Sequence, residues 1–290
     1  MPNLNKGNFI KAAIESVLAQ SYANFELLVV DNGSLDQSVE VIQELARSDD
    51  RVHLVREPRR GISFAMNAGV RTARGSLVTF LGSDDVCHKG RLLQQTKAMT
   101  RDAPKVCYTE GWIIDVAGNP TGKLYNRDIV TLPEVHEGRI FHQLLRNDFV
   151  IGGSMMVARE HLGPEPFDES LGFAEDWDLL VRLASQMDFV YVPTPLYGYR
   201  IYSGNTWARG NERRFHGNYV KTFEKWLKEL DGLNREDRSC ILRKLLKSEE
   251  EIDGKVGMLQ VAVRHPGAAG LLLGMVTSSF SRRIRRSNLS

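Results

Sequence analysis

The feature that most constrains this fold is the alternation of short apolar runs with amphipathic stretches over the first 90 residues. The stretches with helical spacing of apolar residues are 8–20, 36–48 and 62–73, and the strand-like runs are 25–34, 52–58 and 76–85. Strands that alternate with helices pair side by side in parallel, with helices covering both faces of the sheet. The pattern therefore predicts an α/β fold, a Rossmann-like, mostly parallel sheet with flanking helices.

The organisation changes after Gly90. The pattern there predicts helices at 91–99 and 140–147, a hairpin at 105–119, a glycine-interrupted strand at 148–160, an amphipathic helix within 167–187 and a strand pair at 189–202. These elements predict a small antiparallel portion. From Glu212 to Leu259 the chain is highly charged and reads as helical. We therefore expect one domain at 1–205, with halves at about 1–90 and 91–205, and a C-terminal helical appendage with a basic tail at 206–290.

Composition is typical of an ordinary globular protein. The 290 residues are 42% hydrophobic and 26% charged with a formal net charge of +2, which predicts no nucleic-acid partner. The three cysteines have no CxxC spacing, which favours reduced thiols over a disulfide framework or a zinc site. There is no secretory signal and no apolar run long enough to span a membrane, so we expect a cytoplasmic protein.

Acidic residues stand where predicted strands end. Asp31 ends one apolar run, and the adjacent Asp84 and Asp85 end another. In parallel sheets the carboxyl ends of the strands form the ligand crevice, so these acids are expected to converge. Carboxylates gathered in a crevice suit Mg²⁺ or Mn²⁺, which commonly accompany phosphates such as a nucleoside diphosphate. The alternative is that they cap helices or lie in solvated turns.

Three segments carry a family resemblance: FIKAAIESVLAQSYANFELLVVDNGSLDQS, GISFAMNAGVRTARGSLVTFLGSDD and FDESLGFAEDWDLLVRLA. In this order and spacing they resemble the motifs of family-2 glycosyltransferases with the GT-A fold, over roughly residues 1–205. The resemblance implies a hexosyltransferase-like enzyme that moves a sugar from a nucleotide-diphosphate donor to an acceptor hydroxyl with inversion.

The resemblance also assigns residues. On the donor side it implies Asp31, Asn32, Arg60, Asn67, Ser83 and Asp84. Asp84 matches the last acid of the DxD motif and is the expected ligand of a divalent metal, Mg²⁺ or Mn²⁺. Asp176, beside Glu175, matches the catalytic acid that would deprotonate the acceptor. On the acceptor side it implies Gly152, Gly153, Trp177 and Arg200.

Simpler interpretations remain open for several of these positions. Glu175 and Asp176 could be charges favoured by the dipole at a helix N-terminus. The indole of Trp177 could belong to the core or stack on a sugar. Arg60 and Asn67 could be surface polar residues, and the two glycines could mark a bulge.

The sequence also departs from the family pattern. Gly82 replaces the first acid of the DxD motif, which should weaken metal binding or make it depend on bound diphosphate. Asn32 replaces a common second aspartate, so the base is open, with a UDP- or dTDP-sugar as the expected donor. Tyr202 stands where relatives often carry a histidine near the metal.

The start of the chain is another departure. Relatives place a buried strand before the turn at which MPNLN begins. We therefore expect a central parallel strand to be missing, and either a natural reading frame that extends upstream or a less stable protein. Each large apolar side chain lost from such a strand forfeits about 1.5–3 kcal/mol.

Setting and acceptor follow from the resemblance alone. It implies bacterial cell-surface polysaccharide synthesis at the cytoplasmic face of the membrane, with a saccharide or lipid-linked saccharide acceptor. Residues 267–290 combine an apolar stretch with Arg282, Arg283, Arg285 and Arg286, which suggests possible peripheral membrane contact. The alternative to an enzyme is a non-catalytic GT-A relative that binds nucleotide sugar or a protein partner.

Overall fold

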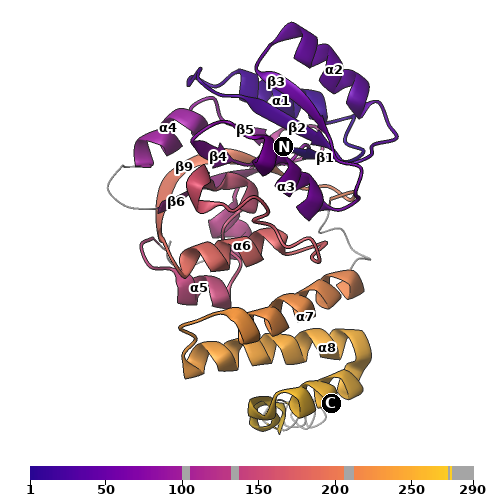
Figure 1. The fold of residues 1–290 in the computed structure, drawn as a ribbon, viewed down its shortest axis with the longest axis vertical. Coiled ribbons are helices and arrows are strands. Elements are labelled where there is room, and N and C mark those ends of the chain that lie inside the picture. Colours follow the sequence, from indigo (N-terminus) through magenta and orange to yellow (C-terminus); the bar gives the residue numbers. More distant parts are fainter. Residues whose placement is uncertain (100–104, 132–136, 206–211, 274, 276–290) are drawn as a thin grey trace. The chain divides into compact units, whose positions relative to one another are not determined.

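The computed structural model describes residues 1–99, 105–131, 137–205, 212–273 and 275 (Figure 1). The chain forms two compact units, Met1–Ala208 and Arg209–Ser290. Each unit is described by itself below.

The first unit begins with a three-stranded parallel sheet. Its strands are β1 (Pro2–Asn3), β2 (Leu27–Asp31) and β3 (Val52–Arg56), in the order β1-β2-β3. Three helices flank it in Figure 1: α1 (Ile10–Leu18), α2 (Ser38–Ser48) and α3 (Ile62–Thr72).

Side chains that alternate along β2 explain this layering. Leu27 and Val29 pack with Ile10 and Ile14 of α1 and with α2. Val30 points to the opposite face and packs against α3. The period of two in the strand thus sends successive apolar residues to opposite helical layers, as expected for a sheet covered on both faces.

A second sheet of six strands completes the first unit. Its path is β4 (Leu77–Thr79), β8 (Met156–Ala158), β6 (Lys105–Ile114), β9 (Asp188–Arg200) and β5 (Val86–Cys87), with β7 (Pro120–Leu124) paired to β6. Strands β6 and β9 are parallel, and the other pairs are antiparallel. The remaining helices are α4 (Arg91–Ala98), α5 (Phe141–Arg146) and α6 (Glu175–Ala184). The predicted α/β class with a parallel sheet and flanking helices is confirmed, although the mixed portion is larger than the sequence suggested.

The predicted strand pair at 189–202 is wrong, because β9 is one strand. Its register against β6 slips where Thr109 faces Val192 and the next residue, Glu110, faces Pro195. Proline has no N–H to donate, so strand pairing around it requires a bulge. The bulge keeps β9 continuous and carries Tyr197 onward beside the β4–β5 connection.

A cavity of about 500 Å³ lies between the two sheets. Met1, Leu28 and Val30 line one side, and Val78 and Phe80 line another. The strand expected to be missing at the start of the chain is represented here by the two residues of β1. The Met1 amino group donates to the carbonyl of Leu28 at 2.9 Å, and its burial lowers the pKa to about 5.

The second unit contains α7 (Glu212–Glu229) and α8 (Arg235–Arg264), followed by a 3₁₀ turn at Pro266–Ala268. A capping box between Asn234 and Asp237 starts α8, and Gly254, at φ 60°, interrupts it. The two helices pack around the buried Trp226, Ile241 and Leu245, among others.

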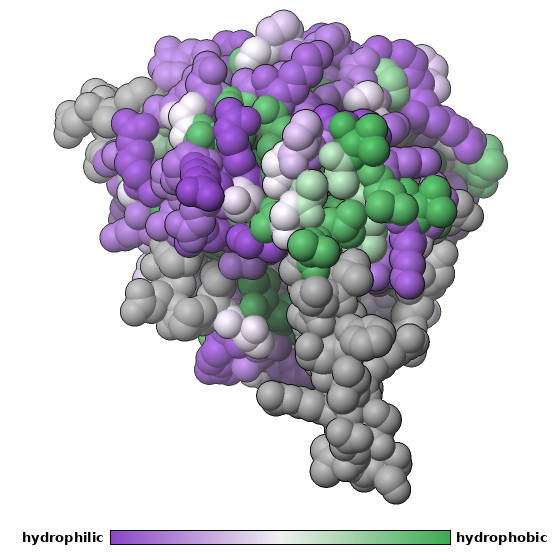
Figure 2. Space-filling view, turned by 90° about the horizontal axis from the view of Figure 1, so that it is seen from below, coloured by the Kyte–Doolittle hydropathy of each residue, from purple (hydrophilic) through white to green (hydrophobic). Residues whose placement is uncertain are grey.

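The later part of this unit exposes apolar side chains. Val256, Leu259, Val263 and Leu273 are exposed, and Figure 2 shows apolar residues gathered on one face of the molecule. Among the described residues, no helix has both the length and the apolar character needed to cross a membrane. The arginines of the tail, and most of the membrane-contact prediction for 267–290, fall outside the described residues.

Candidate functional site

Asp31 organises the turn that follows β2. Its buried carboxylate accepts hydrogen bonds from the backbone N–H groups of Gly33 and Ser34, each at 3.3 Å. The side-chain amide of Asn3 and the guanidinium of Arg56 donate to it at 3.1 Å each. Asp31 therefore fixes the backbone at the carboxyl end of β2, where a ligand of this fold class would bind.

Asn32 holds the neighbouring loop. Its amide nitrogen donates to the carbonyls of Glu57 at 3.0 Å and Arg59 at 2.7 Å, and its amide oxygen accepts from the N–H of Gly61 at 2.8 Å. The side chain is 3% exposed. Asn32 thus joins the ends of β2 and β3 into one rigid rim.

The two predicted donor contacts, Arg60 and Asn67, lie in different surroundings. Arg60 is exposed, and its Nε lies 3.9 Å from the point where a Cβ on Gly33 would stand. Asn67 is fully buried, and its amide exchanges two 2.9 Å hydrogen bonds with the backbone of Phe167. Arg60 therefore lies beside the Asp31 turn, whereas Asn67 joins α3 to the segment before α6.

Asp84 lies at the end of the β4–β5 connection with a cation already against it. Lys6 Nζ is 2.7 Å from Asp84 Oδ2, and the hydroxyl of Tyr202 donates to the same oxygen at 3.0 Å. The Asp84 side chain is 19% exposed, whereas the preceding Ser83 is buried. One face of this carboxylate is therefore open to a ligand.

Asp85 turns the other way, into the interior. It accepts hydrogen bonds from the hydroxyl of Tyr197 and from the N–H of Arg200. Burial, together with the charge of Asp84, raises the pKa of Asp85 to about 7. The guanidinium of Arg200 is itself buried and donates to the carbonyl of Asp84 and to carbonyls at 115 and 116. Arg200, predicted on the acceptor side, thus clamps β9 to the Asp84 turn.

The residues around Asp84 do not fit a divalent ion held by the protein alone. Across the part of the chain that the structure describes, no three His, Cys, Asp or Glu side chains form a group that could hold one. A side chain at Gly82, where the first acid of the motif would stand, would begin 2.7 Å from Asp85 Oδ2 and 3.2 Å from Asp84 Oδ1. Asp84 is therefore left as the one predicted protein ligand.

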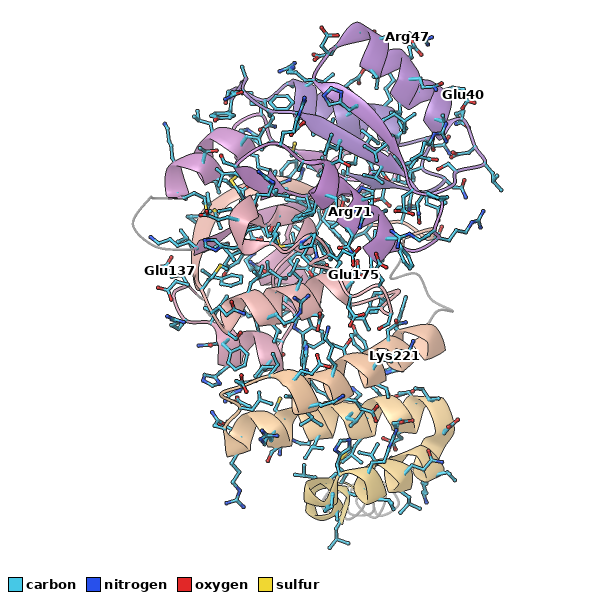
Figure 3. The ribbon with its side chains drawn as sticks, viewed as in Figure 1. Glu40, Arg47, Arg71, Glu137, Glu175 and Lys221 are labelled. Atoms are coloured by element: carbon cyan, nitrogen blue, oxygen red, sulfur yellow. The ribbon has the colours of Figure 1, made fainter. Side chains whose placement is uncertain are left out.

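The second acidic group lies at the start of α6. Ala174 precedes the helix in the left-handed conformation, at φ 62° and ψ 18°, and Glu175 and Asp176 follow in the first turn (Figure 3 labels Glu175). Burial and the charge of Asp176 raise the pKa of Glu175 to about 8. Burial also raises the pKa of Asp176. Burial and mutual repulsion therefore favour a pair that shares one proton over a pair that carries two charges.

Two glycines let the backbone approach both groups of acids. A Cβ on Gly152 would lie 2.6 Å from the Cβ of Asp176 and 2.8 Å from its Cγ. A Cβ on Gly153 would collide with the ring of Tyr197, whose hydroxyl bonds Asp85. The predicted glycine positions therefore lie directly between Asp176 and the Asp85 turn.

Tyr199 connects the two acidic groups electrostatically and was missed from the sequence. Burial and then the charges of Asp85, Asp84 and Asp176, with a further contribution from a neighbouring acid, raise its pKa far above the ordinary value. Its ring packs against Tyr125, with centroids 5.6 Å apart. The alternation of Tyr197 and Tyr199 along β9 was the available signal, because residues two apart share a face of a strand.

Trp177 belongs to the core. It is 4% exposed, and its indole N–H donates to the carbonyl of Leu144 at 2.8 Å. A buried ring has no free face on which a sugar could stack, so the structure favours the core interpretation of Trp177 over sugar stacking.

Comparison with known proteins decides the family. The family model described as glycosyl transferase family 2 matches residues 1–162, which is more than half of the chain. The chain belongs to this family. The predicted resemblance is thereby confirmed, and the match includes Asp31 and Asp84 but ends before Glu175 and Asp176.

Relatives and solved structures agree with this membership. A chondroitin synthase from Escherichia coli is 27% identical over 207 residues, 71% of this family-2 chain, but the match spans only 29% of that synthase. S. aureus TarS 1–349 in complex with UDP-GlcNAc gives a TM-score of 0.59 at 15% identity, covering 88% of this chain and 81% of that one. A mannosyltransferase from Pyrobaculum calidifontis in complex with GDP-Man and Mn²⁺ gives 0.61 at 18% identity, covering 96% and 78%. These similarities confirm the GT-A fold.

Proposed function

We propose that the chain is an inverting glycosyltransferase that moves a sugar from a nucleotide-diphosphate donor to an acceptor hydroxyl. The observation that carries the proposal is the Glu175–Asp176 pair at the start of α6. Both side chains are half-buried, and the pKa of each carboxyl group is raised. Asp176 lies against Gly152, in the same unit of the chain as Asp84. A carboxylate whose pKa is raised toward neutrality is better matched to accept a proton from a hydroxyl than an ordinary surface acid.

The chemistry assigns a separate role to each acid. Asp176 accepts the proton of the acceptor hydroxyl while that oxygen forms a bond to the anomeric carbon of the donor sugar. The bond from the anomeric carbon to the diphosphate oxygen breaks on the opposite face, and its electron pair leaves with the diphosphate. Burial and the charge of Asp176 raise the pKa of Glu175, which disfavours a second charge beside Asp176. The absence of a side chain at Gly152 lets Asp176 lie directly against the backbone there.

The donor nucleotide belongs at the ends of β2 and β3. There Asp31 and Asn32 fix the rim, and Arg60 offers an exposed cation next to Gly33. A UDP- or dTDP-sugar is the proposed donor, and the similar folds in complex with UDP-GlcNAc and with GDP-Man support a nucleotide sugar. A divalent ion, Mg²⁺ or Mn²⁺, would have Asp84 as its protein ligand and would neutralise diphosphate charge. No step above depends on it.

The proposed setting is polysaccharide synthesis. Similarity to part of a chondroitin synthase supports a saccharide acceptor, free or lipid-linked. We also propose that the protein is cytoplasmic and that residues 267–290 contact the inner face of a bacterial membrane. Co-sedimentation with vesicles would test the membrane contact.

Asp176→Asn tests the assignment of the base. The measured quantities are UDP affinity by calorimetry and the release of UDP or dTDP from a panel of sugar nucleotides, with water and with saccharide acceptors. We expect the variant to bind UDP like wild type and to lose transfer by about 10²–10⁴-fold, the usual contribution of a general base. Asp50→Asn makes the same chemical change at an exposed loop position and should change neither quantity.

Two results would overturn the proposal. One is near-normal turnover of Asp176→Asn with a productive acceptor. The other is UDP binding by wild type without release from any donor of the panel, which would favour the non-catalytic alternative. The anomeric configuration of the first product, followed by NMR, tests inversion separately.

A further inference from the structure

Lys6 places a fixed cation where the donor diphosphate is expected. It lies in the turn before α1, and its ammonium contacts Asp84 Oδ2 at 2.7 Å and the hydroxyl of Tyr202. Tyr202 donates to the same Asp84 oxygen at 3.0 Å, so the three polar groups close a triangle. Residues 6, 84 and 202 come from three distant parts of the sequence, and only the folded chain brings them together.

The surroundings hold this ammonium in place. The Lys6 N–H donates to Ser38 Oγ at 3.2 Å, and the next N–H, that of Gly7, donates to Asp36 at 2.8 Å. The ring of Tyr202 lies 5.1 Å from Lys6 Nζ and packs on Phe9. The Lys6 side chain nevertheless keeps 22% of its surface exposed. A ligand can therefore reach a charge that the protein has already positioned.

The neighbouring acids leave Lys6 with a single carboxylate partner. Asp85 is turned away to Tyr197 and to the N–H of Arg200, and Gly82 contributes no side chain. A paired-acid motif would present excess negative charge and need an ion between itself and the diphosphate. Here one carboxylate faces one ammonium, so the group is close to neutral before any ligand arrives.

We propose that the Lys6 ammonium is the resident cation that binds the donor diphosphate, so that nucleotide binding has a component independent of divalent metal. This rests on the proposed function, because it assumes a nucleoside diphosphate at Asp84. A lysine is a compact point charge that suits phosphate oxygens, and a cation preset at the leaving group stabilises the charge that develops there. A divalent ion that bound Asp84 Oδ2 would compete with this ammonium for the same oxygen.

UDP affinity measured by calorimetry in EDTA and in Mn²⁺ tests this inference without any transfer reaction. Wild type should bind UDP in EDTA. Lys6→Met keeps the apolar stem without the charge and should lose about tenfold or more in EDTA, which corresponds to about 1.4 kcal/mol. Mn²⁺ should restore part of this loss, because Asp84 is then free to take the ion. Lys6→Arg should retain most of the affinity in EDTA.

Lys11→Met is the matched control, because Lys11 is an exposed lysine on α1 whose nearest acid, Glu15, is 4.0 Å away. It should bind UDP like wild type in both conditions. Equal UDP affinity of Lys6→Met and wild type in EDTA would overturn the inference, as would wild-type binding that requires Mn²⁺. If Lys6→Met does not fold, Lys6→Gln carries the same comparison.

These results are separable from a failure of the proposed function. In EDTA, Lys6→Met should weaken UDP binding by the same factor in the Asp176→Asn background as in wild type, because the base does not touch the diphosphate. Near-normal transfer by Asp176→Asn with intact UDP binding would count against Asp176 alone, whereas UDP binding that does not depend on Lys6 would count against Lys6 alone.

Discussion

Gly152→Ala should displace the carboxylate of Asp176, the proposed base, without changing its chemistry. The added Cβ would lie 2.6 Å from the Cβ of Asp176 and 2.8 Å from its Cγ. Carbon atoms pack at about 3.5–4.0 Å, so the Asp176 side chain or the 152–154 turn has to move by about 1 Å. A misplacement of that size can reduce turnover by about 10²-fold, or about 2.7 kcal/mol in the barrier. Overpacking should also lower stability by about 1–3 kcal/mol.

The assay is release of nucleotide from the best sugar donor, together with UDP affinity and the melting temperature. We expect turnover to fall by about 10²-fold while UDP affinity stays within about twofold, because the donor side is not altered. Gly163→Ala is the control, because nothing lies within 4 Å of its added Cβ. Turnover of Gly152→Ala equal to that of Gly163→Ala would refute the close approach that we describe between Gly152 and Asp176.

Three further predictions concern other parts of the chain. Because the pKa of Glu175 rises from 4.5 to about 8 on folding, its stabilising effect is complete below about pH 4.5 and is lost as the pH rises to about 8. Glu175→Gln should therefore melt with a weaker pH dependence over this window, and parallel curves would contradict it. A five-residue, β-branched extension before Met1 should enter the cavity and raise the melting temperature by about 2–4 °C per kcal/mol gained, whereas equal melting would count against it. Deletion after Ser279 removes the arginines of the tail and should reduce co-sedimentation with anionic vesicles, and binding indifferent to this deletion, to lipid charge and to salt would remove the membrane proposal.

The parallel half of the fold could be predicted because local pattern and tertiary packing agree there. The apolar stripe of 8–20 becomes α1, and the run ending at Asp31 becomes β2 with its side chains alternating between two helical layers. The pairing of β4 was less accessible. It follows a helix like its predecessors, but pairs antiparallel with β8, which lies about 80 residues later. No short-range pattern encodes that choice.

The same distinction between local pattern and long-range contacts holds for the site residues. Motif position drew attention to Asp84, Asp176 and the two glycines, whose roles stay predictions. Motif position could not show that the side-chain amide of Asn67 bonds to the backbone of Phe167, because the two residues are 100 positions apart in the sequence. It also could not show Lys6, whose importance comes from a contact with a residue 78 positions away. Side chains that build a site and side chains that face a ligand look alike until the fold brings their partners to them.

The bonds between Asn67 and Phe167 have a consequence for how such enzymes could diversify. Both use only the backbone N–H and carbonyl of Phe167, and the hydroxyl of Ser63 likewise donates to the carbonyl of Leu171. Any residue other than proline can supply these groups at 167, and any residue at all can at 171. The exposed side chains of the segment leading into α6 can therefore change from one lineage to another while α3 continues to hold its backbone in the same place. Grafting a foreign acceptor segment onto this donor half should succeed when the backbone trace is kept together with apolar side chains at the buried positions 167 and 171.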